Sequence, residues 1–408
     1  MQILIIGSGI VGLVTAYKFL AAGLSVTLID KETGPCQATS WQNGGQLSYS
    51  HAISLNKIAN YANLSQAMLQ QDYALKVKLR ILWQEFLWFK SFKASKKLNY
   101  DHDFYAFAKI SKIELEQIAQ QINYKNIKNS ASIHILHNKK HFAKMIKFLQ
   151  QQDQASYQIL DLKKLTEILP NFNLKTVKAA ILFKEDQVAD ARDFGLELFS
   201  KCQQFDGFDY IFSAKATKFH QWQDSINAVE INHNQVIKFD KLILATGAKQ
   251  HKEIFSLCSL KSPLIEVRGY SVNFAATKMQ YSLIDYAHKM VYSNLNNQLR
   301  IAGLYDFYGS DNYQLKQRVE NFISKIRAEN LRKNQDSYKI WHGYRPVSKD
   351  GYPIIGRSAI YKNLYYNLAH ANLGWTLAAA SSKILLDEVL EQHIDKKYIF
   401  LQPRRFNI

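Results

Sequence analysis

The sequence predicts an α/β fold in which a parallel-sheet domain is interleaved with a second domain of α+β type. Residues 3–30 have the pattern of a strand, a glycine-rich turn, a helix and a second strand. A further buried strand is predicted at 241–247, KLILATG, and a long helix follows the apolar segment 363–377. Because the chain has six prolines and no Pro-rich linker, we expect the two domains to interrupt each other along the sequence.

The first segment, ILIIGSGIVGLVTAYKFLAAGLSVTLID, has the order of a dinucleotide-binding βαβ unit. Gly7 permits the sharp bend after the strand, Gly9 lets the backbone approach a pyrophosphate, and Gly12 lets the helix pack closely on the sheet. Asp30 ends the second strand, where a carboxylate can accept hydrogen bonds from ribose hydroxyls and favours an unphosphorylated ribose over NADP. Three further residues complete the predicted contacts of this unit: Ile10, Val11 and Lys31.

A secretory signal or a membrane anchor would also produce a largely apolar run over 3–29. However, no Lys or Arg precedes the run, Lys18 interrupts it, and no small-residue cleavage site follows it. The β-branched residues that precede Gly7 and Asp30 are instead typical of two buried parallel strands. We therefore predict the βαβ unit.

Composition indicates a globular protein whose cysteines are free thiols. The chain has 408 residues, of which 47% are hydrophobic, enough for two or three compact units. Cys36, Cys202 and Cys258 are far apart and lack the spacing of metal ligands, so we expect neither a disulfide framework nor a zinc site. This cysteine usage favours a cytoplasmic protein.

The formal net charge of +18 favours an anionic partner such as lipid headgroups, nucleic acid or an acidic protein. Lysines scattered through a chain rich in Lys, Asn and Ile explain the excess equally well. One segment, 76–97, combines this charge with Trp83, Trp88 and apolar residues that recur near helical spacing: KVKLRILWQEFLWFKSFKASKK. The recurring apolar residues are Leu79, Leu82, Trp83, Phe86, Leu87 and Phe89. Such a helix can lie on an anionic membrane, at the inner face of the cell membrane, or pack its aromatic side on its own domain.

The intervening patterns predict a mixture of helices and strands. Helix dominates 51–150, a short strand and a helix occupy 158–170, a helix spans 190–203, and strands are expected at 210–219, 228–231 and 236–239. Strands at 266–274 and 299–304, with a helix over 312–331, indicate a module that covers a substrate.

Motifs near the C-terminus resemble a known family. Residues 341–356 read WHGYRPVSKDGYPIIG and residues 363–377 read NLYYNLAHANLGWTL. With ATSWQNGGQLS (38–48) and VRGYS (267–271), they resemble the FAD-dependent D-amino acid oxidase superfamily, and within it most closely the small subunits of bacterial D-amino acid dehydrogenases. The matching residues, in the family's order, are Gly7, Gly9, Gly12, Asp30, Thr39, Ser40, Asn43, Gly45, Gln46, Arg268, Gly269, Tyr270, Ser271, Arg345, Pro346, Asp350, Gly351, Pro353, Gly356, Leu373, Gly374, Trp375 and Thr376.

This resemblance implies a Rossmann-like FAD-binding domain interleaved with an α+β substrate domain. The FAD-binding domain is expected to comprise residues 1–50, 151–260 and 336–408, and the substrate domain residues 51–150 and 261–335. In the related flavoproteins, the segment that matches KLILATG passes close to the bound FAD.

The resemblance also implies the site residues. Arg345, expected in a turn after a strand, would hold the α-carboxylate of an amino acid substrate, to which a guanidinium offers a two-pronged match. Tyr270 would donate its hydroxyl near that carboxylate or be a core aromatic residue. The start of the last helix would direct backbone N–H groups at the flavin. Beyond the βαβ unit, the residues expected to contact FAD are Thr39, Ser40, Asn43, Gly45, Gln46, Thr246, Gly247, Gly343, Leu373, Gly374, Trp375 and Thr376.

The implied reaction is oxidation of a D-amino acid by hydride transfer from its Cα to flavin N5. Electrons would pass to a quinone or another electron-transfer partner, and the products would be a 2-oxo acid and ammonia. No indispensable side-chain base is expected; His370 is the nearest candidate, but it is more typical of a structural histidine.

Departures from the family pattern leave alternatives open. HANLGWT stands where the family has HGTLGWT, NGGQ replaces NAGQ, and DQVADARD (186–193) replaces a turn that contains Gly and Cys. The alternatives are oxidation of glycine, sarcosine, proline, an opine or a modified tRNA base, a non-catalytic flavoprotein that binds an anionic surface, and an NAD dehydrogenase. Nucleic acid is the less favoured partner.

Overall fold

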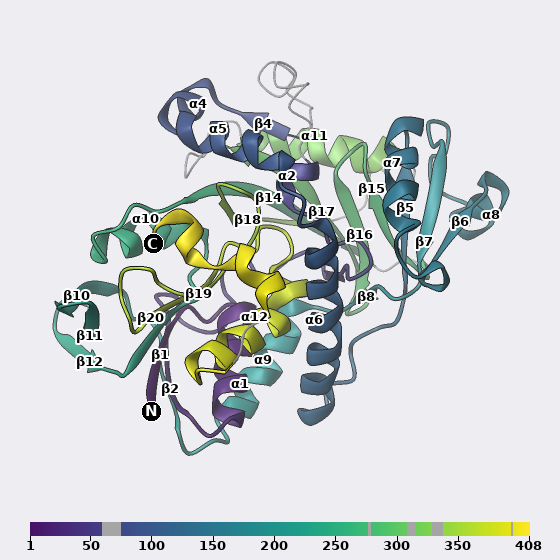
Figure 1. The fold of residues 1–408 in the computed structure, drawn as a ribbon. Coiled ribbons are helices and arrows are strands. Elements are labelled where there is room, and N and C mark those ends of the chain that lie inside the picture. The colour runs from purple at the N-terminus through teal and green to yellow at the C-terminus, as the bar shows by residue number, and fades with distance from the viewer. Residues whose placement is uncertain (59–74, 276–278, 308–314, 329–337, 393–394) are drawn as a thin grey trace.

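The computed structural model describes residues 1–408 except 59–74, 276–278, 308–314, 329–337 and 393–394. Within these residues the chain forms two large sheets, one six-stranded and one nine-stranded, with two small sheets beside them. Figure 1 shows the six-stranded sheet near both termini and the nine-stranded sheet at the opposite side of the molecule.

The six-stranded sheet contains the predicted βαβ unit. Its order is β19-β20-β13-β1-β2-β9, and all neighbours are parallel except β19 and β20. Its elements are β1 (Gln2–Ile6), α1 (Ile10–Ala21), β2 (Ser25–Ile29), β9 (Phe208–Ile211), β13 (Lys241–Leu244), β19 (Ile354–Arg357) and β20 (Leu364–Leu368). The strand predicted from KLILATG is confirmed, because β13 pairs directly with β1.

Both faces of this sheet are covered, which explains why its central strands β1, β2 and β13 are largely apolar. Alternate residues such as Ile3 and Ile5 face a core shared with α1, α9 (Ala191–Cys202) and α12 (Gly374–Val389). Leu4 and Ile6 face the other side, where a three-stranded antiparallel sheet packs. The long helix α6 (Asp101–Gln121) packs on α12, as Figure 1 shows.

The three-stranded sheet corrects one predicted strand. It contains β10 (Ala216–Trp222), β11 (Ser225–Ile231) and β12 (Gln235–Lys238). The strand expected over 210–219 divides between β9 and β10, which belong to different sheets, because Ser213 has a φ of 53° and turns the chain. The helix α10 (His251–Leu257) packs against this sheet.

The nine-stranded mixed sheet carries the second core. Its order is β18-β14-β17-β16-β15-β5-β7-β6, and β4 pairs with β17. Its strands are β4 (Leu75–Val77), β5 (Ser132–Leu136), β6 (Tyr157–Leu160), β7 (Ala179–Phe183), β14 (Leu264–Ala275), β15 (Ser282–Asp285), β16 (Met290–Leu295), β17 (Gln298–Phe307) and β18 (Lys339–Ser348). Buried residues of α11 (Leu315–Ala328) pack on one face; the predicted helix over 312–331 extends at both ends beyond the described residues.

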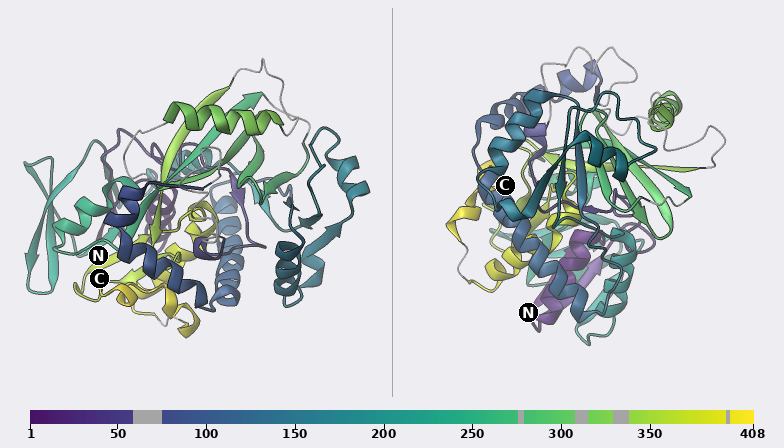
Figure 2. Two further views of the ribbon diagram at one scale, coloured as in Figure 1. Left: turned by 90° about the horizontal axis from the view of Figure 1, so that it is seen from above. Right: turned by 90° about the vertical axis from the view of Figure 1, so that its right-hand side faces the viewer.

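Several smaller elements complete the fold. The β10–β12 sheet and the helix α8 (Leu162–Ile168) are at opposite ends (Figures 1 and 2). The remaining elements are α2 (Leu55–Ile58), α7 (Lys139–Leu149), β3 (Gln46–Leu47), β8 (Gln187–Val188) and 3₁₀ helices at Gln154–Ser156, Ala248–Gln250, Lys396–Leu401 and Pro403–Phe406.

Strand pairing places two segments differently from the expected domain boundaries. The strands β6 and β7 hydrogen-bond to each other, and β7 pairs with β5, so they lie in the mixed sheet, whereas 151–260 was expected in the FAD-binding domain. Likewise β18, within the expected segment 336–408, pairs with β14 of the mixed sheet. Sequence pattern cannot reveal these boundaries, because a strand's partner is fixed only by tertiary structure.

The basic segment 76–97 is two helices instead of one. The helices α4 (Leu79–Gln84) and α5 (Phe86–Ala94) meet at Glu85, whose φ of −115° and ψ of 27° are not helical, and a 3₁₀ turn (Ser95–Lys97) follows. Trp88 and Phe92 are buried, whereas Trp83 is 77% exposed. No helix among the described residues has the length and apolar character needed to cross a bilayer.

Candidate active site

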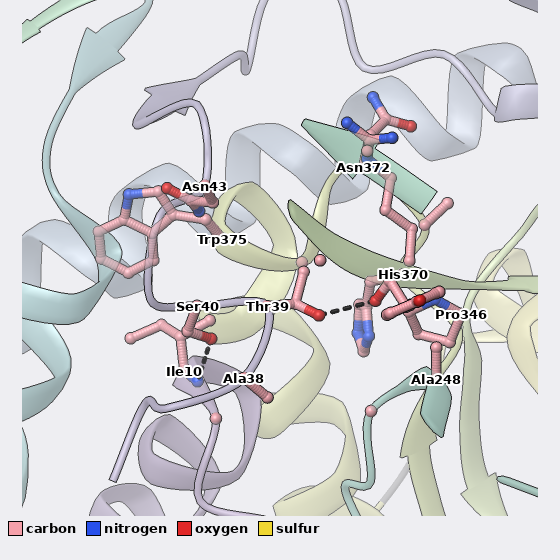
Figure 3. A pocket seen from close by; sticks show the side chains of 18 of the residues that line it. Ile10, Ala38, Thr39, Ser40, Asn43, Ala248, Pro346, His370, Asn372 and Trp375 are labelled. Carbon is pink, nitrogen blue, oxygen red and sulfur yellow. Dashed lines mark hydrogen bonds between the residues drawn. The ribbon is translucent and has the colours of Figure 1, made fainter. Parts of the chain in front are cut away.

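A cavity of about 440 Å³ lies between the two large sheets. Its lining includes the carboxyl ends of β1, β13 and β20, the starts of α1 and α12, and residues of β14, β17 and β18. In parallel sheets, ligands bind outside the carboxyl ends of the strands, and this volume is within the range of ligand clefts. Figure 3 shows this pocket from close by.

The glycine turn after β1 has the geometry that the sequence predicts. Gly7 has a φ of +115°, and a Cβ on it would lie 2.5 Å from the carbonyl oxygen of Ala245. A Cβ on Gly12 would lie 1.8 Å from the Gly7 carbonyl oxygen. At Gly9, by contrast, the nearest atom is Ser40 Oγ at 3.4 Å, and the residue lines the cavity. Packing therefore requires Gly7 and Gly12, whereas Gly9 leaves open space for a ligand.

The start of α1 faces the cavity. Ile10 and Val11 line it, and no acidic residue occupies the first turn. Ser40 Oγ accepts a hydrogen bond from the Ile10 N–H at 3.0 Å (Figure 3). The positive end of the helix dipole is thus directed at the cavity, which suits an anionic group such as a pyrophosphate.

Asp30 also lines the cavity, beside Lys31. Its Oδ2 accepts hydrogen bonds from the backbone N–H of Ser8 at 2.6 Å and from Ser8 Oγ at 2.8 Å, and its Oδ1 accepts from the Glu32 N–H at 2.9 Å. These contacts hold the glycine turn against the end of β2. Because a carboxylate has about four acceptor positions, one remains for a ribose hydroxyl.

The segment 39–46 is attached to the mixed sheet by side-chain hydrogen bonds. Thr39 Oγ1 donates to the Tyr344 carbonyl oxygen on β18 at 2.7 Å, and Gln46 Nε2 donates to the Leu283 carbonyl oxygen on β15 at 3.3 Å. Asn43 Oδ1 accepts from the Gly45 N–H at 2.9 Å, so the turn is fixed from within. These three polar residues thus position the backbone of this segment along the cavity wall.

Sequence reasoning missed Arg300, which anchors this segment. Its Nη1 donates to the Asn43 carbonyl oxygen at 3.1 Å, and its Nη2 lies 2.9 Å from Asp190 Oδ2. Its Nε donates to Asn273 Oδ1 on β14 at 3.0 Å. The signal available in the sequence was an arginine within the otherwise apolar strand pattern of 299–304.

Several polar groups around the cavity have no hydrogen-bond partner among the described residues. They include Thr246 Oγ1 and His370 Nε2, both buried and both in cavity-lining residues. Burial lowers the pKa of His370 to about 3, so this imidazole is neutral at pH 7. A Cβ on Gly247 would meet nothing within 4 Å. Because buried polar groups are normally paired, these groups are available to a polar ligand.

The start of α12, where the sequence predicts a flavin contact, lies at the cavity. Leu373, Gly374, Trp375 and Thr376 line the cavity, and the helix has neither a side-chain cap nor an acidic residue in its first turn. The Trp375 indole, however, donates to the Ala189 carbonyl oxygen at 3.0 Å, so its ring packs in the core. Figure 3 shows it directed away from His370.

Arg345 lies within β18 and not, as expected, in a turn after a strand, because its backbone pairs with Val267 of β14. Its Nη1 donates to the Leu304 carbonyl oxygen at 2.9 Å, and its guanidinium carbon lies 4.6 Å from the ring centroid of Tyr305. A Cβ on Gly269 would lie 2.3 Å from this guanidinium, so glycine makes room for it. Burial lowers the pKa of Arg345, but a guanidinium stays charged at pH 7.

Tyr270 and Arg345 are not brought together. Paired residues of antiparallel strands point to the same face, so Arg345 shares its face with Val267 and Gly269, and Tyr270 points to the other. The Tyr270 hydroxyl donates to Asp306 Oδ2 at 2.8 Å in the second core. Burial raises the pKa of Tyr270.

Two aromatic residues that the sequence did not indicate lie on the Arg345 face of the cavity. They are Tyr305 and Trp341. A Cβ on Gly343 would lie 2.1 Å from the Trp341 ring, so this glycine contacts the indole directly.

The parallel sheet, its glycine turn and the two helix starts that face one cavity define the class of dinucleotide-dependent proteins, with a second sheet on the other side of the cavity. The chain belongs to the DAO family of FAD-dependent oxidoreductases, whose model matches residues 2–388. The cofactor is therefore FAD, and the open space at Gly9 and Gly247 and the unpartnered Thr246 hydroxyl fit such a ligand.

Individual relatives agree with this assignment. The chain is 25% identical to a D-amino acid dehydrogenase of Vibrio atlanticus over 430 residues, covering 100% of both chains. It is 26% identical to D-amino acid dehydrogenase 2 of Pseudomonas aeruginosa, covering 95% of this chain and 94% of the relative. The fold is similar to that of L-proline dehydrogenase from P. horikoshii, with a TM-score of 0.75, 16% identity and coverage of 99% and 97%.

Proposed function

We propose that the protein oxidises D-amino acids to 2-oxo acids and ammonia and passes the electrons to a quinone or another acceptor. The observation that carries this proposal is the Arg345 guanidinium on the cavity wall, in a chain with full-length similarity to two D-amino acid dehydrogenases. FAD, when bound, accepts the hydride that leaves the substrate Cα.

The chain's own residues bind and orient the substrate. Arg345 has one donor committed to Leu304, and its remaining donors can bind the α-carboxylate. Trp341 and Tyr305 flank this position and exclude water from it. Fixing the carboxylate restricts the orientation of the Cα–H bond, which is how positioning lowers the barrier to transfer.

The test is anaerobic mixing of the FAD-loaded protein with D- and L-amino acids, glycine, sarcosine, proline, an opine and a modified nucleoside, while flavin absorbance is followed. We expect D-amino acids to bleach the flavin faster than their L-enantiomers. Faster bleaching by another amine would identify one of the alternative oxidations. A flavin that no amine bleaches would contradict any amine-oxidising function and favour a non-catalytic role. Reoxidation by a quinone faster than by air would support a dehydrogenase.

We further propose that the helices α4 and α5 bind an anionic membrane surface on its cytoplasmic side. Leu79, Trp83, Phe86 and Leu87 are all more than half exposed, which is unusual for such large apolar side chains. The exposed lysines of the same segment are Lys90, Lys93, Lys96 and Lys97. Trp88 holds the segment on the protein through a hydrogen bond from Nε1 to the Pro263 carbonyl oxygen at 3.1 Å. Exposed aromatic residues beside lysines favour the interface of an anionic bilayer.

Vesicle sedimentation tests this surface. Replacing Lys90, Lys93, Lys96 and Lys97 with Gln should weaken binding to vesicles containing phosphatidylglycerol, and added salt should weaken binding of the unmodified protein. The matched control replaces four exposed lysines of α7 with Gln: Lys139, Lys140, Lys144 and Lys147. The apolar residues of this helix face the protein core, so α7 has no exposed apolar face of the kind found on α4 and α5. Equal losses in both variants would show a nonspecific effect of net charge and contradict the proposal.

A further inference from the structure

Five polar side chains form a continuous hydrogen-bonded chain from the cavity wall into the protein. His51 and Tyr286 line the cavity. The Tyr286 hydroxyl lies 2.8 Å from His51 Nδ1 and 3.3 Å from His134 Nδ1. His134 Nε2 lies 3.1 Å from Ser132 Oγ, which donates to Asp186 Oδ2 at 2.6 Å. The chain therefore ends at a carboxylate.

The mixed sheet assembles this chain from segments that are distant in sequence. Ser132 and His134 are alternate residues of β5 and share one face of the strand. Tyr286 directly follows β15, the parallel neighbour of β5, and Asp186 precedes β8 (Figure 1). Ser132, His134 and Asp186 are each at most 1% exposed, so water does not reach the inner end.

The terminal carboxylate fixes the direction of every hydrogen bond. An ionised Asp186 can only accept, so Ser132 donates to it and its oxygen accepts from His134 Nε2–H. A neutral His134 then has a bare Nδ1, which accepts from the Tyr286 hydroxyl. The Tyr286 oxygen can accept from His51 Nδ1–H, the shorter of its two contacts with that ring; Nε2 lies 3.5 Å away. His51, which lines the cavity, is thereby left with an unprotonated Nε2.

We propose that this chain, named here the His51–Asp186 relay, takes up the proton that a substrate ammonium must lose before oxidation. The inference rests on the proposed amine-oxidising function. The N–H bond of the ammonium breaks and leaves its electron pair on nitrogen, while His51 Nε2 gains the proton. His51 Nδ1–H, the Tyr286 hydroxyl, His134 Nε2–H and the Ser132 hydroxyl then each pass one proton inward. Asp186 becomes neutral, and no electrons leave the relay.

The environment of the relay agrees with this direction of transfer. Burial raises the pKa of Asp186, which favours its neutral form after proton uptake, and lowers that of His51 to about 4, which disfavours an imidazolium at the outer end. Burial also lowers the pKa of His134, which is therefore neutral. The other titratable groups that interact with these residues, from neighbouring elements, are Tyr49, Tyr105, Lys109 and Tyr305, and Lys289 lies over the Tyr286 ring.

Stopped-flow flavin reduction across pH tests the relay in the FAD-loaded protein. Tyr286→Phe removes the hydroxyl that joins the two imidazoles, and Ser132→Ala breaks the relay nearer to Asp186. We expect each to slow reduction about 100-fold at pH 7, in the range of general acid–base effects. Because a neutral amine needs no relay, both deficits should disappear as the pH approaches the substrate's amine pKa. The matched control, Tyr292→Phe on β16, removes a hydroxyl that donates to Met290 Sδ at 3.4 Å and is not part of the relay; it should react like the wild type.

The outcomes separate the two proposals. If no amine reduces the wild-type flavin, the proposed function fails. If amines reduce the wild type and Ser132→Ala has the wild-type rate and pH profile, the relay to Asp186 is wrong. A deficit in Tyr286→Phe that persists at high pH would indicate lost positioning and would also overturn the relay.

A second measurement does not depend on activity. The nitrogen chemical shifts of ¹⁵N-histidine-labelled protein at pH 7 should show two neutral imidazoles of opposite tautomers, His51 with Nδ1–H and His134 with Nε2–H. Single His→Gln variants assign the two signals. A His134 protonated at Nδ1, or an imidazolium at either position, would contradict the hydrogen-bond directions on which the relay depends.

Discussion

The Arg345 guanidinium lies 4.6 Å from the ring centroid of Tyr305, and both side chains line the cavity between the two sheets. The ring supports one face of the guanidinium, and the Leu304 carbonyl oxygen fixes one of its nitrogens. The arginine is therefore held in place before substrate arrives, which reduces the entropy lost on binding.

Replacing Arg345 should weaken catalysis through loss of carboxylate binding. We expect Arg345→Ala to lower kcat/KM for D-amino acids roughly 100-fold, about 3 kcal/mol for two charge-assisted hydrogen bonds. Arg345→Lys should recover little, because an ammonium cannot make the same two-pronged contact. Arg357→Ala, at an exposed arginine of β19, is the control. Normal steady-state kinetics in Arg345→Ala would exclude the proposed role.

The ion pair between Arg300 and Asp190 should stabilise the fold. Both side chains are 7% exposed, and removing one partner leaves a buried charge, so Arg300→Met should cost about 3–5 kcal/mol in urea unfolding. Adding Asp190→Asn should restore part of this loss, because the uncompensated charge is removed while an Oδ1 acceptor remains for the α9 start. A double variant less stable than Arg300→Met would argue against this explanation.

Substituting the glycines of the first turn should affect either stability or FAD binding, depending on the position. Gly12→Ala places a Cβ 1.8 Å from a carbonyl oxygen and should destabilise the protein by at least ~3 kcal/mol. Gly9→Ala should change stability by less than ~1 kcal/mol, since its φ of −69° suits alanine. It should nevertheless weaken FAD binding tenfold or more, measured by flavin fluorescence, because the methyl group enters the cavity. If Gly9→Ala leaves the affinity for FAD unchanged, the prediction that the pyrophosphate lies beside Gly9 is wrong.

Acid should destabilise the protein through its buried neutral histidines. Burial lowers the pKa of His251 to about 4 and that of His370 to about 3, below the value of about 6.5 expected in the unfolded chain. Between these values the unfolded state binds more protons, so stability falls as pH decreases below 6.5, by about 1.4 kcal/mol per pH unit for each histidine.

Urea unfolding at pH 4–7 measures this slope. His251→Gln should make it shallower, whereas His233→Gln, at an exposed histidine, should not. The same slope in all three proteins would show that other groups control acid stability.

The fold and much of the cofactor site follow from local sequence. Gly7 has a φ of +115°, and neither Gly7 nor Gly12 has room for a Cβ, so both positions require glycine. Such glycines are recognisable in the sequence pattern. The apolar runs of β1, β2 and β13 likewise reflect burial on both faces. The motif around Arg345 predicted it as a site residue, but it did not predict that the residue lies within a strand.

Other parts of the site have no local signal. Trp375 belongs to the expected flavin motif, yet its indole packs in the core because Ala189 offers it an acceptor. Tyr270 and Arg345 seemed suited to one carboxylate, but strand register places them on opposite faces of the mixed sheet. Arg300 became visible only through its contacts with Asn43 and Asp190.

The sequence by itself predicted a dinucleotide site at the N-terminal βαβ unit, because its glycines and Asp30 satisfy constraints that act within 30 residues. Only the tertiary structure decided that β6, β7 and β18 belong to the mixed sheet and that His51, Tyr286, His134, Ser132 and Asp186 meet. Contacts between distant segments depend on strand order and register, and neither is encoded in the pattern of any one strand.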